Sequence, residues 1–102
     1  MILYNVTVNI DNDVEKDWLQ WMKEVHIPDV MSTGLFVSSK MYKVLSDDEG
    51  GTTYAIQYSC ANMALYERYR DEHAGRLQSE TQRTFGGRYV AFRTLLEVVH
   101  PI

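Results

Sequence analysis

Polar and apolar residues alternate along residues 2–10, a pattern that predicts a β-strand with one apolar face. The same two-residue period returns over residues 52–60 and 88–99, and more weakly over 35–45, as is typical of an edge strand. The acidic, glycine-ended run 46–51 indicates a turn between two of these segments. The chain therefore contains four predicted strands, of which the second and third form a hairpin.

Apolar residues at spacings of three and four predict an amphipathic helix after the first strand. Asn12 and Glu15 fit a capping pair at its start. Its apolar stripe consists of Val14, Trp18, Trp21, Met22 and Val25. Pro28 lacks an N–H and disfavours helical geometry at the residue before it, so the helix ends or kinks at about His26. Pro28 can also start one further turn, which Gly34 would close.

A second helix is predicted between the third and fourth strands. It begins at Asn62, whose side chain can cap it, and it ends at Gly86-Gly87. Its stripe consists of Leu65, Tyr66, Tyr69, His73 and Leu77. Gly75 weakens the helix shortly after His73, so we expect a break or a change of register there.

The order β-α-β-β-α-β predicts one ferredoxin-like domain over residues 1–102, of the α+β class. Right-handed crossovers place both helices on one face of a four-stranded antiparallel sheet. The strand residues expected to meet the helices are Val6, Val8, Ile56, Tyr58, Phe92 and Leu96. The opposite face is mixed, carries Arg93 and has no helix to cover it.

Composition excludes several classes of partner. The net charge of −4 gives no electrostatic footprint for nucleic acid, and no apolar run is long enough to span a bilayer. The single cysteine, Cys60, cannot form an intrachain disulfide, fits a reducing cytoplasm, and is expected to be a small buried residue. Neither His26 with Asp29 nor Glu72 with His73 has the spacing of a zinc motif, so we expect no metal site.

Three segments carry a family resemblance: residues 4–8 (YNVTV), 18–30 (WLQWMKEVHIPDV) and 90–94 (VAFRT). They resemble a bacterial family of proteins of about this length that is labelled a domain of unknown function. Its wider relatives are similar to the dimeric α/β-barrel superfamily, which includes cofactor-independent antibiotic-biosynthesis monooxygenases, muconolactone isomerase and ligand-binding domains of some transcription regulators. The resemblance implies a homodimer with facing sheets and a pocket between sheet and helices. It implies no particular reaction, because one fold hosts many functions.

Two histidines are candidate catalytic groups. His26, at a helix end, could donate or accept a proton near neutral pH, and it could equally satisfy free carbonyls at the helix terminus. His73, within an aromatic stripe, is either a second catalytic group or a half-buried packing residue.

Trp21, Tyr66 and Tyr69 either fill the core or line a flat apolar ligand pocket. Arg93 would orient an anion. If a second subunit covers the mixed sheet face, Arg93 must instead be paired across the interface.

We therefore expect a small cytoplasmic homodimer that binds a small organic molecule. As an enzyme it would oxygenate or isomerise an aromatic or enol-like substrate without a bound cofactor, with His26 as the proton-transfer group. The alternative is a non-catalytic dimeric module that senses a ligand or serves as a scaffold.

Overall fold

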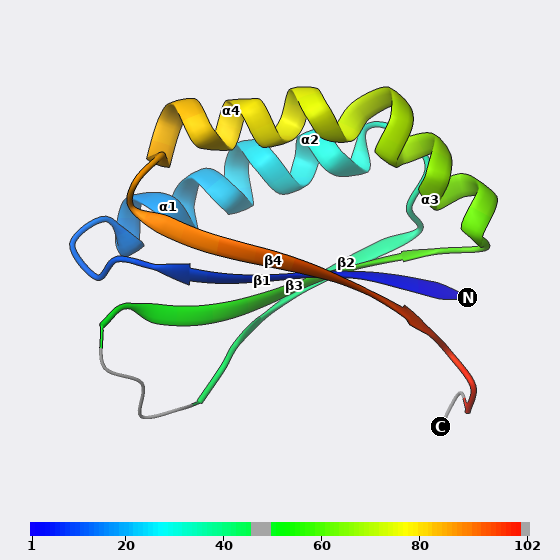
Figure 1. Cartoon of the computed structure of the whole chain (residues 1–102), viewed down its shortest axis with the longest axis horizontal. Helices are drawn as coiled ribbons and strands as arrows, with labels where there is room; N and C mark the ends of the chain where they lie inside the picture. Colours follow the sequence, from blue (N-terminus) through cyan, green and yellow to red (C-terminus); the bar gives the residue numbers. More distant parts are fainter. Residues whose placement is uncertain (46–49, 101–102) are drawn as a thin grey trace.

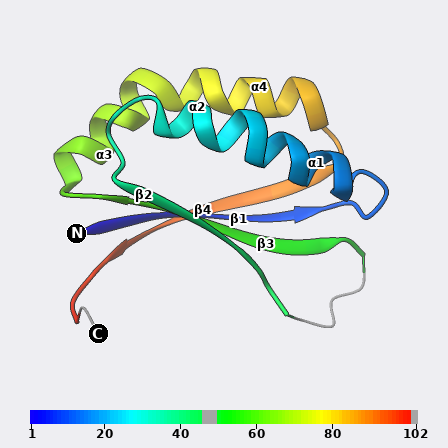
Figure 2. The ribbon, with the colours of Figure 1, turned by 180° about the vertical axis from the view of Figure 1, so that it is seen from behind.

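The computed structural model describes residues 1–45 and 50–100, and the predicted acidic residues of the hairpin turn, 46–49, lie outside them. The strands are β1 (Ile2–Ile10), β2 (Ser38–Lys43), β3 (Thr52–Cys60) and β4 (Tyr89–Glu97). They form one antiparallel sheet in the order β2-β3-β1-β4. All helices cover the same face of this sheet (Figures 1 and 2), so the predicted ferredoxin-like fold is confirmed.

Each helical crossover is one rod interrupted by a five-residue π-helical turn. The pieces are α1 (Glu15–Trp21), η1 (Met22–His26), α2 (Ile27–Met31), α3 (Met63–Tyr69), η2 (Arg70–Ala74) and α4 (Gly75–Phe85), where η marks the π turns. Both candidate histidines lie in these turns, His26 in η1 and His73 in η2. The predicted change of register next to Gly75 is therefore confirmed as a π turn.

Pro28 does not end the first helix: it lies in the first turn of α2, directly after the π turn η1, and the backbone stays helical from η1 into α2. The wider turn is visible in one bond, from the Ile27 N–H to the Met22 carbonyl oxygen five residues back. Gly34, with a φ of 76°, closes the rod, as the second reading of the sequence expects.

The π turn decides which side chain faces inward. A π turn takes more residues per revolution than an α turn. Residues after Met22 are therefore rotated about the helix axis away from the positions that the α-helical stripe predicts. Val25, predicted to be buried, is 41% exposed, and His26 faces the sheet side instead. Trp18, which precedes the turn, and Met22, at its first position, are buried as predicted.

Asn12 and Glu15 do not form the predicted capping pair, since no side chain caps α1. Both accept from hydroxyls of β3: Thr52 Oγ1 lies 3.0 Å from Asn12 Oδ1 and from Glu15 Oε1, and Tyr54 donates to Glu15 Oε2 at 2.5 Å. Burial, and to a smaller extent the hydrogen bond to Glu15, raises the pKa of Tyr54 to about 12. The predicted cap at Asn62 is confirmed, with its Oδ1 accepting a backbone N–H at 3.0 Å.

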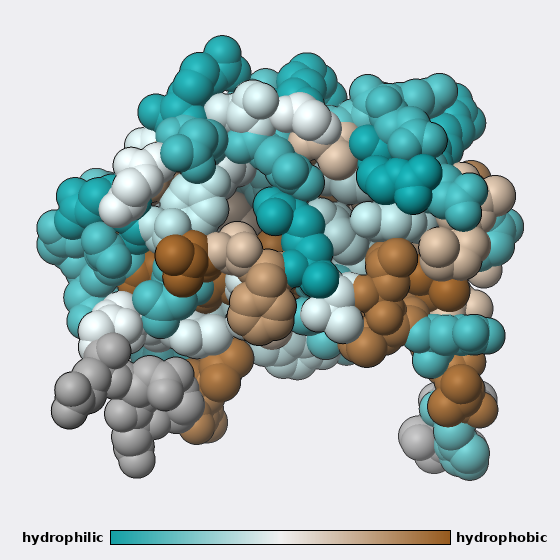
Figure 3. Space-filling view, viewed as in Figure 1, coloured by the Kyte–Doolittle hydropathy of each residue, from teal (hydrophilic) through white to brown (hydrophobic). Residues whose placement is uncertain are grey.

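Strand β4 is turned over relative to the prediction. In the antiparallel register Val6 pairs with Arg93 and Val8 with Ala91, and directly paired residues share a face of the sheet. Arg93 therefore lies on the helix-covered face, whereas Phe92 lies on the open face and is 63% exposed. The alternation misleads here because β4 carries apolar residues on both faces, and only the pairing with β1 selects one. Apolar surface accordingly shows along β4 below the polar surface of α4 (Figure 3).

Candidate functional site

A cavity of about 40 Å³ lies between the sheet and the helices. Its apolar wall comes from β1, β3, β4, α1 and η1, and includes Val6, Val8, Trp18, Met22, Ile56 and Ala91. Its polar wall consists of His26, Tyr58, Thr81, Tyr89 and Arg93. The volume corresponds to about three water positions, at roughly 10–15 Å³ each.

His26 lines this cavity and carries one fully buried ring nitrogen. Among the described residues, its Nδ1 is the buried side-chain nitrogen or oxygen that has no hydrogen-bond partner. The ring stacks on Trp21 with centroids 5.1 Å apart and planes inclined by 22°. Burial lowers the pKa of His26; the carboxylates of Asp29 and Glu80 oppose this shift and Arg93 adds to it. The imidazole is therefore neutral at neutral pH and can accept a proton there.

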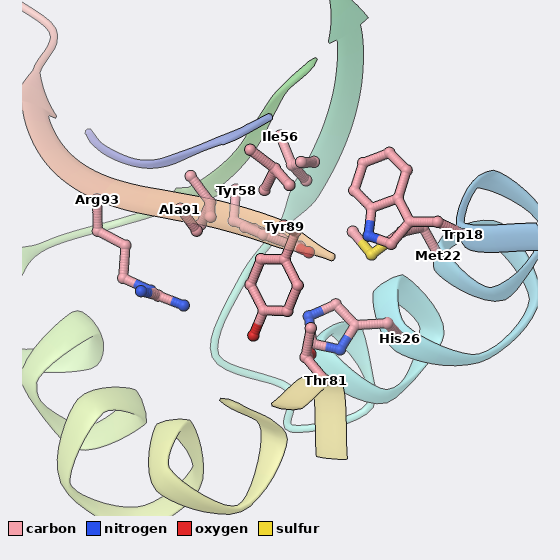
Figure 4. A pocket seen from close by; sticks show the side chains of 11 residues that line it. Trp18, Met22, His26, Ile56, Tyr58, Thr81, Tyr89, Ala91 and Arg93 are labelled. Carbon is pink, nitrogen blue, oxygen red and sulfur yellow. The ribbon is translucent and has the colours of Figure 1, made fainter. Parts of the chain in front are cut away.

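Arg93 supplies the positive charge of the cavity wall. Its Nε donates to the hydroxyl of Tyr4 at 3.1 Å, so the predicted neighbours on the open face, among them Gln57, are not its partners. Burial raises the pKa of Tyr4, which keeps the phenol neutral. The guanidinium and the imidazole of His26 approach the cavity from opposite sides, with the Tyr89 ring between them (Figure 4).

An outer groove of about 530 Å³ runs between α4 and β4. Its lining from α4 is polar and includes Gln78, Ser79 and Gln82. Tyr89, Ala91 and Arg93 line both the groove and the cavity, so the two spaces meet at β4. The Tyr89 hydroxyl is 3.2 Å from Gln82 Oε1, which holds the tyrosine across the junction.

His73 does not join this site. It lies in η2, 4.0 Å from the Glu72 carboxylate, with its ring 6.3 Å from that of Tyr69, and it lines neither the cavity nor the groove. The structure therefore separates the two histidines that the sequence offers as catalytic groups.

Trp21, Tyr66 and Tyr69 do not share a pocket. Trp21 packs on Phe85 and His26, with centroid distances of 5.5 and 5.1 Å. The rings of Tyr66 and Tyr69 lie 5.2 and 5.7 Å from that of Tyr4. All three pack against residues of the site and not into the cavity itself. Trp21 packs on His26, and the two tyrosines pack on the Tyr4 ring, whose hydroxyl accepts from Arg93.

Sequence reasoning missed Tyr4, Thr81 and Tyr89. Tyr4 falls within the predicted strand 2–10 and is not singled out there, although a tyrosine hydroxyl in a core needs a partner and so signals a polar group nearby. Tyr89 is missed because β4 is assigned the wrong way round. Thr81 carries no sequence signal, since its hydroxyl donates to the Leu77 carbonyl within α4, as many helical threonines do.

Within residues 1–45 and 50–100, no three side chains of His, Cys, Asp or Glu come together in a way that could hold a metal ion. No helix in that part of the chain combines the length and apolar character needed to cross a bilayer.

The fold is ferredoxin-like, with a cavity between the sheet and the helices. Residues 1–99 match the family described as domain of unknown function DUF4286, and the chain belongs to that family. No curated protein matches the sequence.

Similar solved structures agree with the fold. A dimeric ferredoxin-like protein from an uncultured marine organism has 11% identity and a TM-score of 0.74, over 99% of this chain and 96% of that one. SnoaB, a cofactor-independent oxygenase from Streptomyces nogalater, has 9% identity and a TM-score of 0.68, over 99% and 96%. An antibiotic biosynthesis monooxygenase has 14% identity and a TM-score of 0.66, over 98% and 100%. At these identities the likeness is one of fold.

Proposed function

We propose that the protein binds a small organic molecule where the cavity meets the α4–β4 groove, and that His26 removes a proton from it. The observation that carries this proposal is that His26, which lines the cavity, has a buried Nδ1 without a hydrogen-bond partner. An unsatisfied buried polar atom costs free energy, about 1–3 kcal/mol, and such costs concentrate where a ligand supplies the missing partner. Burial also lowers the pKa of His26, so the acceptor form prevails at neutral pH.

The reaction we favour is cofactor-free oxygenation or isomerisation of an aromatic or enol-like substrate. Both begin when His26 takes a proton from an acidic carbon. In an isomerisation the proton returns at another position. In an oxygenation the carbanion of an activated methylene passes an electron pair to dioxygen; one oxygen atom becomes the product carbonyl, and the other leaves as water with the two methylene hydrogens. The fold likeness to SnoaB, a cofactor-independent oxygenase, supports this class of reaction.

A second function, ligand sensing without catalysis, is favoured by the size of the cavity. Its 40 Å³ holds a few waters and becomes larger only by opening into the groove. In this reading the uptake of a ligand beside Tyr89 moves β4 or α4, and His26 contributes a hydrogen bond to the ligand.

For the assembly we propose a homodimer formed through the open sheet face. The exposed apolar residues on that face are Tyr42, Val90, Phe92 and Leu96, at 46%, 70%, 63% and 42% exposure. Soluble domains seldom leave a large apolar sheet surface in water, and two-fold pairing is the commonest way to cover it. The similar ferredoxin-like protein is described as dimeric, which supports this pairing.

The test uses a panel of enolisable aromatic ketones and phenols in heavy water. We expect wild type to catalyse carbon–hydrogen exchange, seen by NMR, and an oxygen electrode to show whether dioxygen is consumed. His26→Ala should lose most of the rate, by about 100-fold or more, and His73→Ala should retain it. Equal exchange by wild type and His26→Ala would remove His26 from the mechanism. Binding of panel members without exchange would instead support the sensing function.

A further inference from the structure

The charge of Arg93 has no carboxylate partner among the described ion pairs. Arg68, Arg70, Arg76 and Arg88 each pair with a carboxylate, whereas Arg83 and Arg93, both exposed, have no such pair in the described structure. Two carboxylates act on the cavity residue His26, Asp29 more strongly than Glu80, and Glu80 contacts Arg76 at 3.6 Å. The Nε of Arg93 donates a hydrogen bond to Tyr4, a neutral phenol. Its two terminal amino groups can still donate to a ligand.

Arg93 lies between an apolar and a polar region of the site. Its side chain lines both the apolar cavity and the polar groove, at the junction that Tyr89 spans. Across the cavity from Arg93 lie aromatic and aliphatic side chains, such as Trp18 and Met22 (Figure 4), whereas the groove offers the side-chain amides of Gln78 and Gln82. A molecule that satisfies both regions has an apolar body and one polar end at the junction.

The other ionisable groups at the site leave Arg93 as its fixed positive charge. Burial lowers the pKa of His26, so the imidazole is neutral at neutral pH. Burial also keeps Tyr4 protonated, so this hydroxyl cannot neutralise the guanidinium. A planar guanidinium that is not neutralised by the protein matches an oxyanion in both charge and geometry.

Building on the proposed function, we infer that the ligand is an apolar, ring-containing monoanion whose carboxylate or enolate-type oxygen binds Arg93 and whose ring enters the cavity toward His26. The Tyr89 side chain must swing away from Gln82 to admit the ring, which joins the two spaces. The protein as a whole carries a net charge of −4, so Arg93 provides the local attraction that lets an anion approach.

The test compares naphthoate with naphthamide, a pair of the same shape that differ in charge. Binding is measured by calorimetry and by the fluorescence of Trp18, which lines the cavity. We expect wild type to bind naphthoate about tenfold or more tightly than naphthamide, the effect of one charge-assisted hydrogen bond. Arg93→Gln, whose amide can still donate to Tyr4, should lose this preference and bind naphthamide as wild type does.

The matched control is Arg83→Gln, which removes an exposed arginine of α4 that lines neither space. It should keep the preference for naphthoate. A salt titration of wild type needs no variant and should weaken naphthoate binding alone. Equal binding of the two probes by wild type, or a preference that survives in Arg93→Gln, would overturn the inference and leave the binding site in place. Binding of neither probe would overturn the inference together with the proposed function.

Discussion

At the scale of single residues, two cavity-lining side chains of the first helical rod, Trp18 and His26, affect stability in opposite directions. Trp18 is 1% exposed and packs against Tyr54, with ring centroids 5.1 Å apart. His26 also sits against the core, yet it brings a nitrogen that nothing in the described structure satisfies. The first side chain stabilises the fold, and the second costs it free energy, as groups reserved for function often do.

The pH dependence of stability should report His26. Burial lowers its pKa below the ordinary value of 6.5, so the unfolded chain binds the proton more readily than the folded one. The free energy of unfolding should therefore fall as pH drops below about 6.5, by at most about 1.4 kcal/mol per pH unit, and level off below the folded pKa. Urea unfolding between about pH 7 and pH 5 measures this for wild type and for His26→Phe.

The phenylalanine variant should lack this fall and be no less stable near neutral pH. His73→Gln controls for the loss of a histidine elsewhere. Parallel profiles for wild type and His26→Phe would contradict a buried, neutral imidazole.

The tryptophans should differ in their contribution to stability. Trp18→Ala removes a fully buried indole and should cost about 3–5 kcal/mol. Trp21→Ala should cost less, because this indole is only half-buried, on the outer side of His26 and Phe85. Urea denaturation of both variants checks the order, and a larger loss for Trp21→Ala would show that the anchor has been assigned to the wrong residue.

At the scale of elements, the sequence predicts those whose apolar face is unambiguous. Strands β1 and β3 have one apolar side, and their central pairing and facing follow from alternation. Strand β4 is apolar on both sides, so its facing depends on pairing with β1, which is a long-range property that a local pattern does not contain. The inward position of His26 is hidden in the same way, because an α-helical period assigns that place to Val25 and only the π turn changes it.

Two turn glycines offer a matched test of the loops that frame the elements. Gly34 and Gly51 have φ values of 76° and 80°, so either alanine variant adopts a left-handed backbone at about 1–2 kcal/mol. At Gly34 an added Cβ meets no atom within 4 Å, whereas at Gly51 it would meet Asn9 Oδ1 and, at 2.8 Å, the Ile10 carbonyl oxygen. Thermal unfolding should show Gly51→Ala to be clearly the less stable variant. Equal melting temperatures would mean that Asn9 and Ile10, at the end of β1, move aside for the added Cβ without loss of stability.

At the scale of the whole molecule, the sheet separates two surfaces. The helix-covered side holds His26 and Arg93, and the open side holds Phe92 and its apolar neighbours. The proposed reaction site and the proposed subunit interface therefore lie on opposite sides of one layer of backbone. The two surfaces approach each other at β4, where Val90 belongs to the open face and also lines the α4–β4 groove.

The assembly should be sensitive to Phe92. We expect light scattering of wild type at micromolar concentration to give twice the chain mass of 11.9 kDa. Phe92→Glu places a charge within the proposed interface and should yield a folded monomer that still binds ligand. Val25→Glu, which changes an exposed apolar residue on the helical layer, should remain dimeric. A wild-type monomer, or a Phe92→Glu dimer, would refute pairing through the open face.

The alternation of β4 also limits how this family can evolve. Phe92 and Arg93 are adjacent in the chain and belong to different surfaces, so the insertion or deletion of one residue in Tyr89–Glu97 would exchange the two sets of side chains in a single event. Substitutions on either side can be selected separately, whereas a change of length alters both surfaces at once. Across relatives the length of this strand should therefore vary far less than its composition.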